Sequence, residues 1–166
     1  MAGHGLVRLL VWSVPLWLGS PVLAQSATVV SIGDGDTVRV RLGGEVRSVR
    51  LACIDAPETA QIPWGQQARS QLQALLPIGS AVDLCSTTSD RYGRLVAQLS
   101  RGGRNVNQAL VASGAAFVYR RYIAGCDRQT YSRLETSARL QRLGVWSVRG
   151  GIPRPWDVRR GAQRQP

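Results

Sequence analysis

The sequence predicts an α+β protein, a five-stranded β-barrel of the OB-fold kind that carries three helices. Three observations predict this fold. Five strand-like segments follow one another along the chain, and a single helical segment lies between the third and the fourth. No internal repeat or second hydrophobic core is apparent, which indicates a single domain.

The first three predicted strands form a meander. The β-branched run at 28–32 stops at a Gly-Asp-Gly turn, and residues 37–42 alternate apolar residues with Arg. The pair Gly43-Gly44 is typical of a hairpin turn, and a third strand is predicted over 45–54.

A helix and two more strands complete the predicted barrel. Residues 66–76 place apolar side chains at helical spacing and end before Pro77. The segments 80–87 and 95–100 are strand-like, with a turn between them.

Two further helices are predicted in the C-terminal half. Asn105 precedes Gln108 by three residues, a spacing similar to a capping box, and Gly114 ends this helix. The third helix covers 127–143, with Asp127 as its N-cap. Its apolar positions are expected to be Tyr131, Leu134, Ala138 and Leu140.

The two ends of the chain differ from the domain at 25–148. Residues 1–24 combine a weakly positive start, a short apolar stretch and small residues, as in a secretory signal peptide; an uncleaved membrane anchor is the alternative. Residues 149–166 are predicted to be an Arg-rich flexible tail, either a solvated end or an electrostatic arm. We therefore expect an exported protein, periplasmic or secreted, that is monomeric and has no membrane partner after signal cleavage.

The charged residues exclude most hydrolase machinery. All 21 basic residues are Arg, against 10 acidic residues, for a net charge of +11, and the only His is His4 in the predicted signal. Without His or Lys, the mature chain cannot host a Ser-His-Asp triad, a Cys-His pair, a Schiff-base lysine or a His-ligated zinc ion. Acid–base chemistry must use carboxylates, and the charge favours a polyanionic partner: nucleic acid, or failing that an anionic membrane or glycan.

Four of the acidic residues lie in two short loops. Asp34 and Asp36 flank a Gly after the first strand, and Asp55 and Glu58 follow the third strand. Ordinary turn chemistry and a loop or cap role are the alternatives. If the barrel brings both loops to one end, the carboxylates repel one another unless a cation intervenes, and oxygen ligands suit Ca²⁺ or Mg²⁺.

Two arginines complete this pattern. Arg50 lies on the third strand, and Arg94 follows the turn between the last two strands; for each, a solvated outward side chain is the alternative. Beside a metal ion, two guanidinium groups would form a fork for phosphate oxygens. A divalent cation, two Arg and a carboxylate that handles the attacking water would together suit phosphodiester hydrolysis.

Five motifs in register resemble the staphylococcal nuclease-like (thermonuclease) family. They are DGDTV at 34–38, RLACIDAPET at 50–59, DRYGR at 90–94, NVNQALV at 105–111 and GVWS at 144–147. The resemblance implies an OB-fold barrel with three helices that cleaves DNA and RNA with Ca²⁺ and leaves 3′-phosphate ends.

The resemblance also implies a role for each matching residue. Asp36, Asp55 and the backbone carbonyl of Ala56 would be metal ligands, with Asp34 in the outer shell. Glu58 would be the general base or the group that orients water, and Arg50 and Arg94 would bind the scissile phosphate. Arg91, Tyr92 and, more weakly, Tyr122 would contact substrate, although a packed barrel-edge role is the alternative for Tyr92. The loop at 59–65 is short compared with the secreted type member.

The three cysteines indicate one disulfide and one leftover thiol in an exported chain. In the family's topology the places of Cys85 and Cys126 lie near each other, which implies a bond between these two. Cys53 lies on the predicted third strand, whose apolar residues should face the core, so it is expected to be a buried free thiol.

Two functions of different classes remain. The first is an exported Ca²⁺-dependent nuclease, and the second is a non-catalytic OB-fold module that binds nucleic acid. The presence of both Arg, the Glu and both Asp favours the nuclease. A cationic protein acting on envelopes would leave the motif spacing unexplained.

Overall fold

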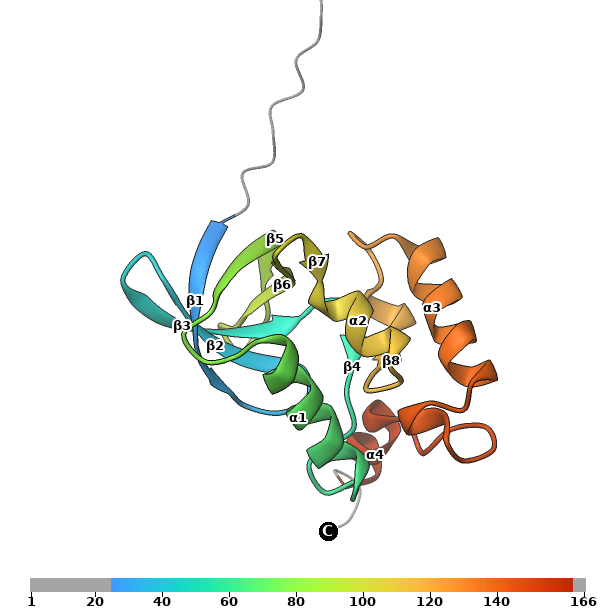
Figure 1. Ribbon diagram of the computed structural model, residues 1–166. Coiled ribbons are helices and arrows are strands. Elements are labelled where there is room, and N and C mark those ends of the chain that lie inside the picture. Colours follow the sequence, from blue (N-terminus) through green and yellow to red (C-terminus); the bar gives the residue numbers. More distant parts are fainter. Residues whose placement is uncertain (1–24, 163–166) are drawn as a thin grey trace, which may run out of the picture.

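The computed structural model describes residues 25–162 (Figure 1). The predicted signal peptide lies outside these residues. Within the described part of the chain, no helix is long and apolar enough to cross a membrane.

Five strands form a closed barrel, which confirms the predicted α+β fold class. They are β1 (Gln25–Ile32), β2 (Thr37–Leu42), β3 (Glu45–Leu51), β5 (Ala81–Ser89) and β6 (Leu95–Arg101). Hydrogen bonds join them in the order β3-β2-β1-β5-β6, and a short strand β7 (Arg104–Asn105) pairs antiparallel with the end of β6. A parallel pairing of β3 with β6, with Val49 opposite Leu95, closes the barrel.

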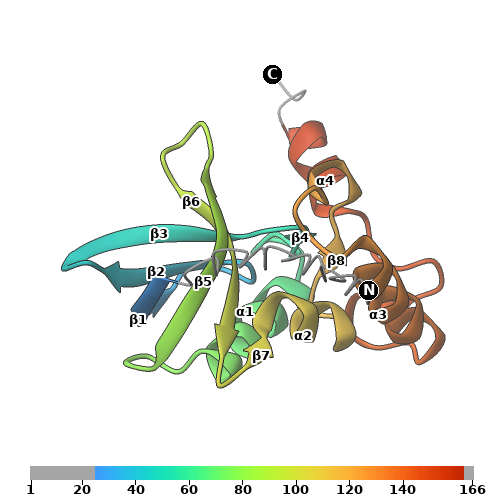
Figure 2. The same cartoon turned by 90° about the horizontal axis from the view of Figure 1, so that it is seen from above.

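The barrel core follows the period-two alternation of the strands. Val38 and Val40 on β2, with Val49 and Leu51 on β3, are at most 1% exposed, whereas Arg39 between the first two faces solvent. Figure 2 shows the barrel on one side of the molecule and the C-terminal helices on the other. The barrel therefore presents one end to these helices, and the candidate site lies at that end.

The three predicted helices are present. They are α1 (Trp64–Leu75), α2 (Val106–Ala112) and α3 (Arg128–Leu140), and Asn105 and Asp127 cap the last two through Gln108 N–H and Thr130 N–H. Tyr131 and Ala138 are buried as predicted, but Leu140 is 80% exposed. Short 3₁₀ turns cover Arg120–Tyr122 and Gly144–Trp146.

The third strand ends earlier than predicted, and this break shapes the site. β3 stops at Leu51, and Cys53 adopts a positive φ of 67°. A separate strand, β4 (Ile54–Asp55), pairs with β8 (Phe117–Val118) outside the barrel sheet. The buried amide of Asn107 supports the break because it donates to Ala52 O at 3.0 Å. Asp55 therefore lies between the barrel and the helices.

A fourth helix, α4 (Pro155–Ala162), lies where the sequence predicted a flexible tail without periodicity. The prediction of a single core is also wrong, because a second apolar cluster anchors this segment. The cluster comprises Phe117, Ala138, Val145, Trp146 and Ile152. Trp156 of α4 stacks on Tyr119 with ring centroids 5.0 Å apart and an interplanar angle of 3°.

The predicted Cys85–Cys126 disulfide is wrong. Cys126 is bonded to Cys53, and Cys85 is the free thiol. The physical reason is the break after β3. The predicted third strand runs through Cys53 and would place its side chain in the core, but β3 ends at Leu51. The positive φ of Cys53 instead turns this residue out of the strand pattern, toward the segment before α3. Cys85 stays in β5, paired with Gln98 of β6.

Candidate active site

The site is built first on the turn between β1 and β2. Asp34 accepts the backbone N–H of Asp36 through Oδ1 at 3.0 Å, which fixes the turn. Gly35 lies against Ala56 and Ala68, and a Cβ there would come within 2.7 Å of both side chains. The turn therefore packs directly on the loop that follows β4, and Asp36 is only 2% exposed.

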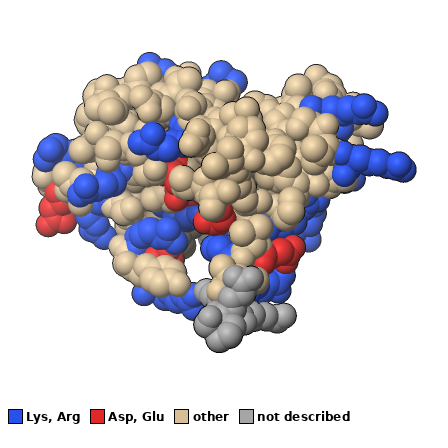
Figure 3. Space-filling model, turned by 90° about the horizontal axis from the view of Figure 1, so that it is seen from below, with Lys and Arg blue, Asp and Glu red and all other residues tan. Residues whose placement is uncertain are grey.

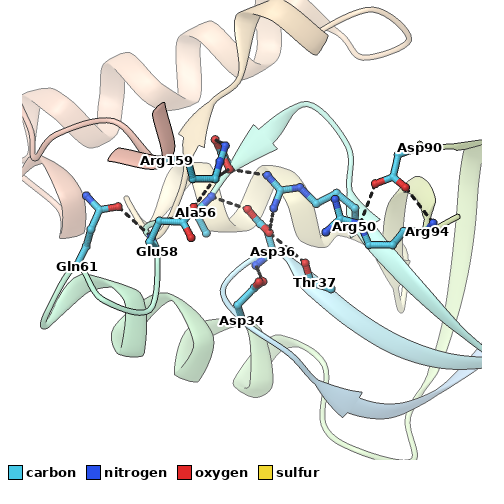
Figure 4. A network of polar contacts seen from close by, with 11 residues as sticks. Asp34, Asp36, Thr37, Arg50, Ala56, Glu58, Gln61, Asp90, Arg94 and Arg159 are labelled. Carbon is cyan, nitrogen blue, oxygen red and sulfur yellow. Dashed lines mark hydrogen bonds and ion pairs between the residues drawn. The ribbon is translucent and has the colours of Figure 1, made fainter. Parts of the chain in front are cut away.

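Arg50 joins the two predicted metal-binding carboxylates. It alternates with the buried Val49 and Leu51 on β3 and therefore points out of the barrel interior. Its Nη1 donates to Asp36 Oδ1, and its Nη2 donates to Asp55 Oδ1 at 2.5 Å (Figure 4). Asp55 is fully buried. The two carboxylates thus converge on a single guanidinium group, and Arg50 is not a solvated strand residue.

The loop after β4 carries Ala56 and Glu58. The backbone N–H of Ala56 donates to Asp36 Oδ2 at 2.6 Å, so both oxygens of Asp36 have partners. The N–H of Glu58 donates to Gln61 Oε1 at 2.9 Å, which closes the loop. Gly65 lets α1 approach this loop, because a Cβ there would lie 2.2 Å from the carbonyl oxygen of Glu58.

Arg159 of α4 enters the same cluster from the far end of the chain. Its Nη2 donates to Asp55 Oδ2 at 2.6 Å, and its Nη1 donates to Asp55 Oδ1 at 3.2 Å and to Glu58 Oε1. We call Asp36, Asp55 and Glu58, together with Arg50 and Arg159, the carboxylate cluster. The sequence analysis missed Arg159.

Burial dominates the electrostatics of this cluster. It raises the pKa of Asp36 to about 7, although Arg50 acts in the opposite direction; Asp34 and Asp55 raise it further. Burial alone would lower the pKa of Arg50 and of Arg159, but their carboxylate partners raise both pKa values. The carboxylates are therefore crowded in a poorly solvated place that favours cations.

The residues present fit a hard divalent cation. The donors are oxygen atoms only, and the oxygens of Asp36 and Asp55 converge on the same point. Among residues 25–162, no group of three or more His, Cys, Asp or Glu side chains is arranged to hold a metal. A cation here would take two protein carboxylates and complete its shell with a carbonyl oxygen and water, as Ca²⁺ and Mg²⁺ accept.

The other predicted substrate residues lie on the turn between β5 and β6. Arg94 donates through Nε to Asp90 Oδ2 at 2.8 Å, on the side of Arg50 away from Glu58 (Figure 4). Arg91 and Arg94 lie over the ring of Tyr92, with 4.8 and 5.5 Å from guanidinium carbon to centroid. Tyr92 is 68% exposed, which excludes a packed barrel-edge role.

A groove of about 1690 Å³ joins this turn to the carboxylate cluster. Its lining includes Arg91, Tyr92 and Arg94 of the turn between β5 and β6, and Tyr122, Trp156 and Arg159 of the C-terminal part of the chain. Tyr122 is exposed, with its ring against Tyr119 at 4.9 Å. Figure 3 shows blue Arg side chains around the red carboxylates and a hollow on this face. The groove brings together residues from all the predicted site segments, in a field that favours polyanions.

A signal in the sequence does indicate α4. Pro155 stands at the first helical position, Asp157 lies in the first turn, and Arg159 and Arg160 lie in the last turn. This order matches the preference for Pro at helix starts and for charges that oppose the helix dipole. Nothing in the sequence places Arg159 beside Asp55, however, because 104 residues separate them.

The known proteins that this chain resembles carry nuclease or endonuclease names. Residues 48–148 match the family model described as staphylococcal nuclease homologue. The chain is similar to a micrococcal nuclease of Shigella flexneri, 37% identical over 163 residues, covering 93% of this chain and 88% of the relative. An uncharacterized endonuclease of Escherichia coli O157:H7 is 36% identical over 139 residues (82% and 87%). One of Haemophilus influenzae is 33% identical over 134 residues (80% and 72%).

Proposed function

The chain belongs to the staphylococcal nuclease family and is a nuclease, and we propose that it is an exported, Ca²⁺-dependent enzyme. In this proposal it hydrolyses phosphodiester bonds of DNA and RNA and leaves 3′-phosphate ends. One observation carries the proposal: two buried carboxylates, Asp36 and Asp55, converge on one Arg at the end of an Arg-lined groove. Nucleic acid is the polyanion that such a groove and a net charge of +11 suit.

The proposed mechanism assigns the chemistry to residues of this chain. Glu58, 34% exposed at the groove, accepts a proton from the attacking water. Arg50 and Arg94 bind the non-bridging oxygens of the scissile phosphate and stabilise its charge in the transition state. The water oxygen bonds to phosphorus as the P–O5′ bond breaks, the departing O5′ takes a proton from solvent water to become a hydroxyl group, and Glu58 returns its proton to the solvent. The phosphate then remains on the 3′ oxygen.

Asp36, Asp55 and the carbonyl of Ala56 would hold the Ca²⁺, with Asp34 behind them. When bound, the ion would neutralise charge on the phosphate and polarise it. The oxygen-only donor set supports this assignment, and so does the raised pKa of Asp36, because a buried carboxylate is stabilised by a nearby cation.

Arg91, Tyr92 and Tyr122 would contact the flanking nucleotides. Tyr92 and Tyr122 are both exposed and both line the groove, so each offers a ring on which a base can stack. Arg91 donates to the Tyr92 hydroxyl at 2.6 Å and keeps a positive charge beside that ring.

Export is supported by two independent features. The N-terminal 24 residues have the pattern of a signal peptide, and the Cys53–Cys126 disulfide suits an oxidising compartment. We propose that the mature monomer begins at Gln25. Mass spectrometry of the protein recovered from a secreting host would give this N-terminus, and a retained segment 1–24 would contradict it.

A nuclease assay tests the proposal directly. Purified protein is incubated with single-stranded DNA, double-stranded DNA or RNA, in Ca²⁺ or in a chelator, and the ends of the products are identified. Cleavage only with Ca²⁺ and 3′-phosphate ends are expected. Cleavage in chelator would refute the metal dependence. Binding without cleavage in Ca²⁺ would favour the OB-fold binding module.

A further inference from the structure

Arg159 is a part of the carboxylate cluster that lies outside the residues matched by the family model. The family match ends at residue 148, whereas Arg159 lies on α4, Pro155–Ala162. Its guanidinium nevertheless contacts two residues of the proposed catalytic set, Asp55 and Glu58. These contacts are the evidence for the role of Arg159.

Arg159 occupies the atoms that a metal ion would need. Both oxygens of Asp55 accept from it, at 2.6 and 3.2 Å, and Asp55 has no exposed surface through which to turn toward another partner. A Ca²⁺ ion lies roughly 2.3–2.6 Å from its ligand oxygens. A guanidinium group that pairs with both oxygens of Asp55 competes with Ca²⁺ for the same lone pairs and repels the ion, whereas Arg50 donates to Asp55 at Oδ1.

α4 has anchors that do not depend on Arg159. Pro155 is buried, Trp156 stacks on Tyr119, and the Arg154 guanidinium lies 4.3 Å from the ring centroid of Phe117. These contacts hold the first turn of the helix against the second apolar cluster. The Arg159 side chain can therefore leave Asp55 while the start of α4 stays docked.

We propose that Arg159 is an intramolecular competitor of the metal ion. It neutralises Asp55 and Glu58 while no divalent cation is bound, and its release from Asp55 accompanies metal binding. Arg159 is thus a positioning residue that sets the metal affinity of the nuclease. This inference rests on the proposed function, because it requires a metal ion at Asp55.

Calorimetric titration of CaCl₂ into metal-stripped protein, without nucleic acid, tests the inference. We expect Arg159→Gln to bind Ca²⁺ about tenfold more tightly than the wild type, since it loses one charge-assisted competitor. Arg159→Lys should lie between them, because a single ammonium group cannot pair with two carboxylates in the same way.

Arg160→Gln is the matched control. Arg160 is the next residue of the same helix, carries the same charge and, within residues 25–162, forms its ion pair with Asp157. It therefore reports the effect of one lost charge without the contact to Asp55. Its Ca²⁺ affinity should stay within about twofold of the wild type. Equal affinities of Arg159→Gln and Arg160→Gln, or weaker binding by Arg159→Gln, would overturn the inference.

Hydrogen exchange of the wild-type protein gives a second measurement that needs no variant. Saturating Ca²⁺ should speed the exchange of the last turn of α4, which loses its ionic contact with Asp55. Unchanged or slower exchange there would overturn the inference. If neither the wild type nor any variant binds Ca²⁺, the proposed metal dependence fails as well. If all bind it equally, only the role of Arg159 fails.

Discussion

The two arginines predicted to hold the scissile phosphate lie in contrasting settings. Arg50 belongs to a buried cluster at the barrel end, where it contacts Asp36 and Asp55. Arg94 lies on the exposed turn between β5 and β6, where it contacts Asp90. The first setting is fixed by barrel strands and by a disulfide at Cys53, and the second by a single hairpin turn.

The contrast indicates a division of labour. The barrel end holds charges in place before substrate arrives, which is the arrangement that electrostatic catalysis requires. The turn holds exposed Arg and Tyr side chains that can adjust to a nucleic-acid strand. Arg94 must exchange Asp90 for a phosphate, whereas Arg50 already faces the carboxylates. Substitutions at the barrel end and substitutions on the turn should therefore differ in their effects on cleavage rate and on Ca²⁺ affinity.

The largest expected effect on stability comes from the cysteines. Cys53 and Cys126 cross-link the segment at the barrel end, whereas Cys85 is a free thiol on β5. Cys53→Ser or Cys126→Ser should lower the free energy of unfolding by about 4 kcal/mol, because the bond closes a loop of 73 residues. Cys85→Ser should change it by less than about 1 kcal/mol, as expected for a half-buried thiol without a partner. Denaturant unfolding measures all three. Equal losses of unfolding free energy in the three variants would mean that the Cys53–Cys126 bond does not stabilise the barrel end.

Arg50→Gln should be the most damaging arginine substitution for turnover. Removal of a preorganised donor costs about 3–4 kcal/mol of barrier, or a rate loss of about 10²–10³. Single-turnover cleavage measures this loss. The same variant should bind Ca²⁺ more tightly without nucleic acid, because Arg50 also occupies Asp36 and Asp55. Unchanged turnover would remove Arg50 from the proposed mechanism.

Arg94→Gln should be less damaging and should leave Ca²⁺ affinity unchanged. Its side chain is partly exposed and pairs with Asp90 outside the carboxylate cluster. The loss of one charge-assisted hydrogen bond to phosphate predicts a roughly 10- to 100-fold fall in cleavage rate. A change in Ca²⁺ affinity as large as that of Arg50→Gln would contradict the separation of the two regions.

The last expected effect is gradual, a pH dependence of stability that arises at Asp36. Burial raises its pKa to about 7, with Asp34 and Asp55 acting in the same direction and Arg50 against it. The folded protein therefore keeps a proton that the unfolded chain loses above about pH 4. Its free energy of unfolding should fall as the pH rises from about 4 to 7, at up to about 1.4 kcal/mol per unit for this group.

The variant Asp36→Asn isolates this contribution. Thermal melts in chelator should show a weaker fall with pH for the variant than for the wild type. Added Ca²⁺ should stabilise the wild type more at pH 8 than at pH 5, because a bound ion replaces the proton. Parallel pH curves for the two proteins would contradict the assignment to Asp36.

Local patterns in the sequence predict the barrel and its site segments well. The alternation at 37–42, the Gly43-Gly44 turn and the caps Asn105 and Asp127 all act within a few residues, and each is present in the structure. Asp36 and Asp55 could be expected to meet because the Asp36 turn leads into β2 and the Asp55 segment follows β3, the antiparallel neighbour of β2. Their shared partner Arg50 confirms that the two loops converge.

The features that the sequence does not reveal depend on contacts between distant segments. The end of β3 depends on Asn107, which donates to Ala52 O from α2, and the disulfide partner of Cys126 depends on that break. α4 has local helix signals, but its docking needs Phe117, Trp146 and Tyr119 from elsewhere in the chain. The position of Arg159 follows from that docking.

The central claim is that the carboxylate cluster performs the hydrolysis, and Glu58→Gln tests it most directly. Glu45→Gln is the matched control, because Glu45 is an exposed Glu on β3 whose ion partner is Arg47. Single-turnover cleavage of DNA in Ca²⁺ is measured alongside DNA affinity. We predict a rate loss of about 10²–10⁴ for Glu58→Gln with DNA binding retained, and no loss for Glu45→Gln. Cleavage by Glu58→Gln at the wild-type rate would contradict the account.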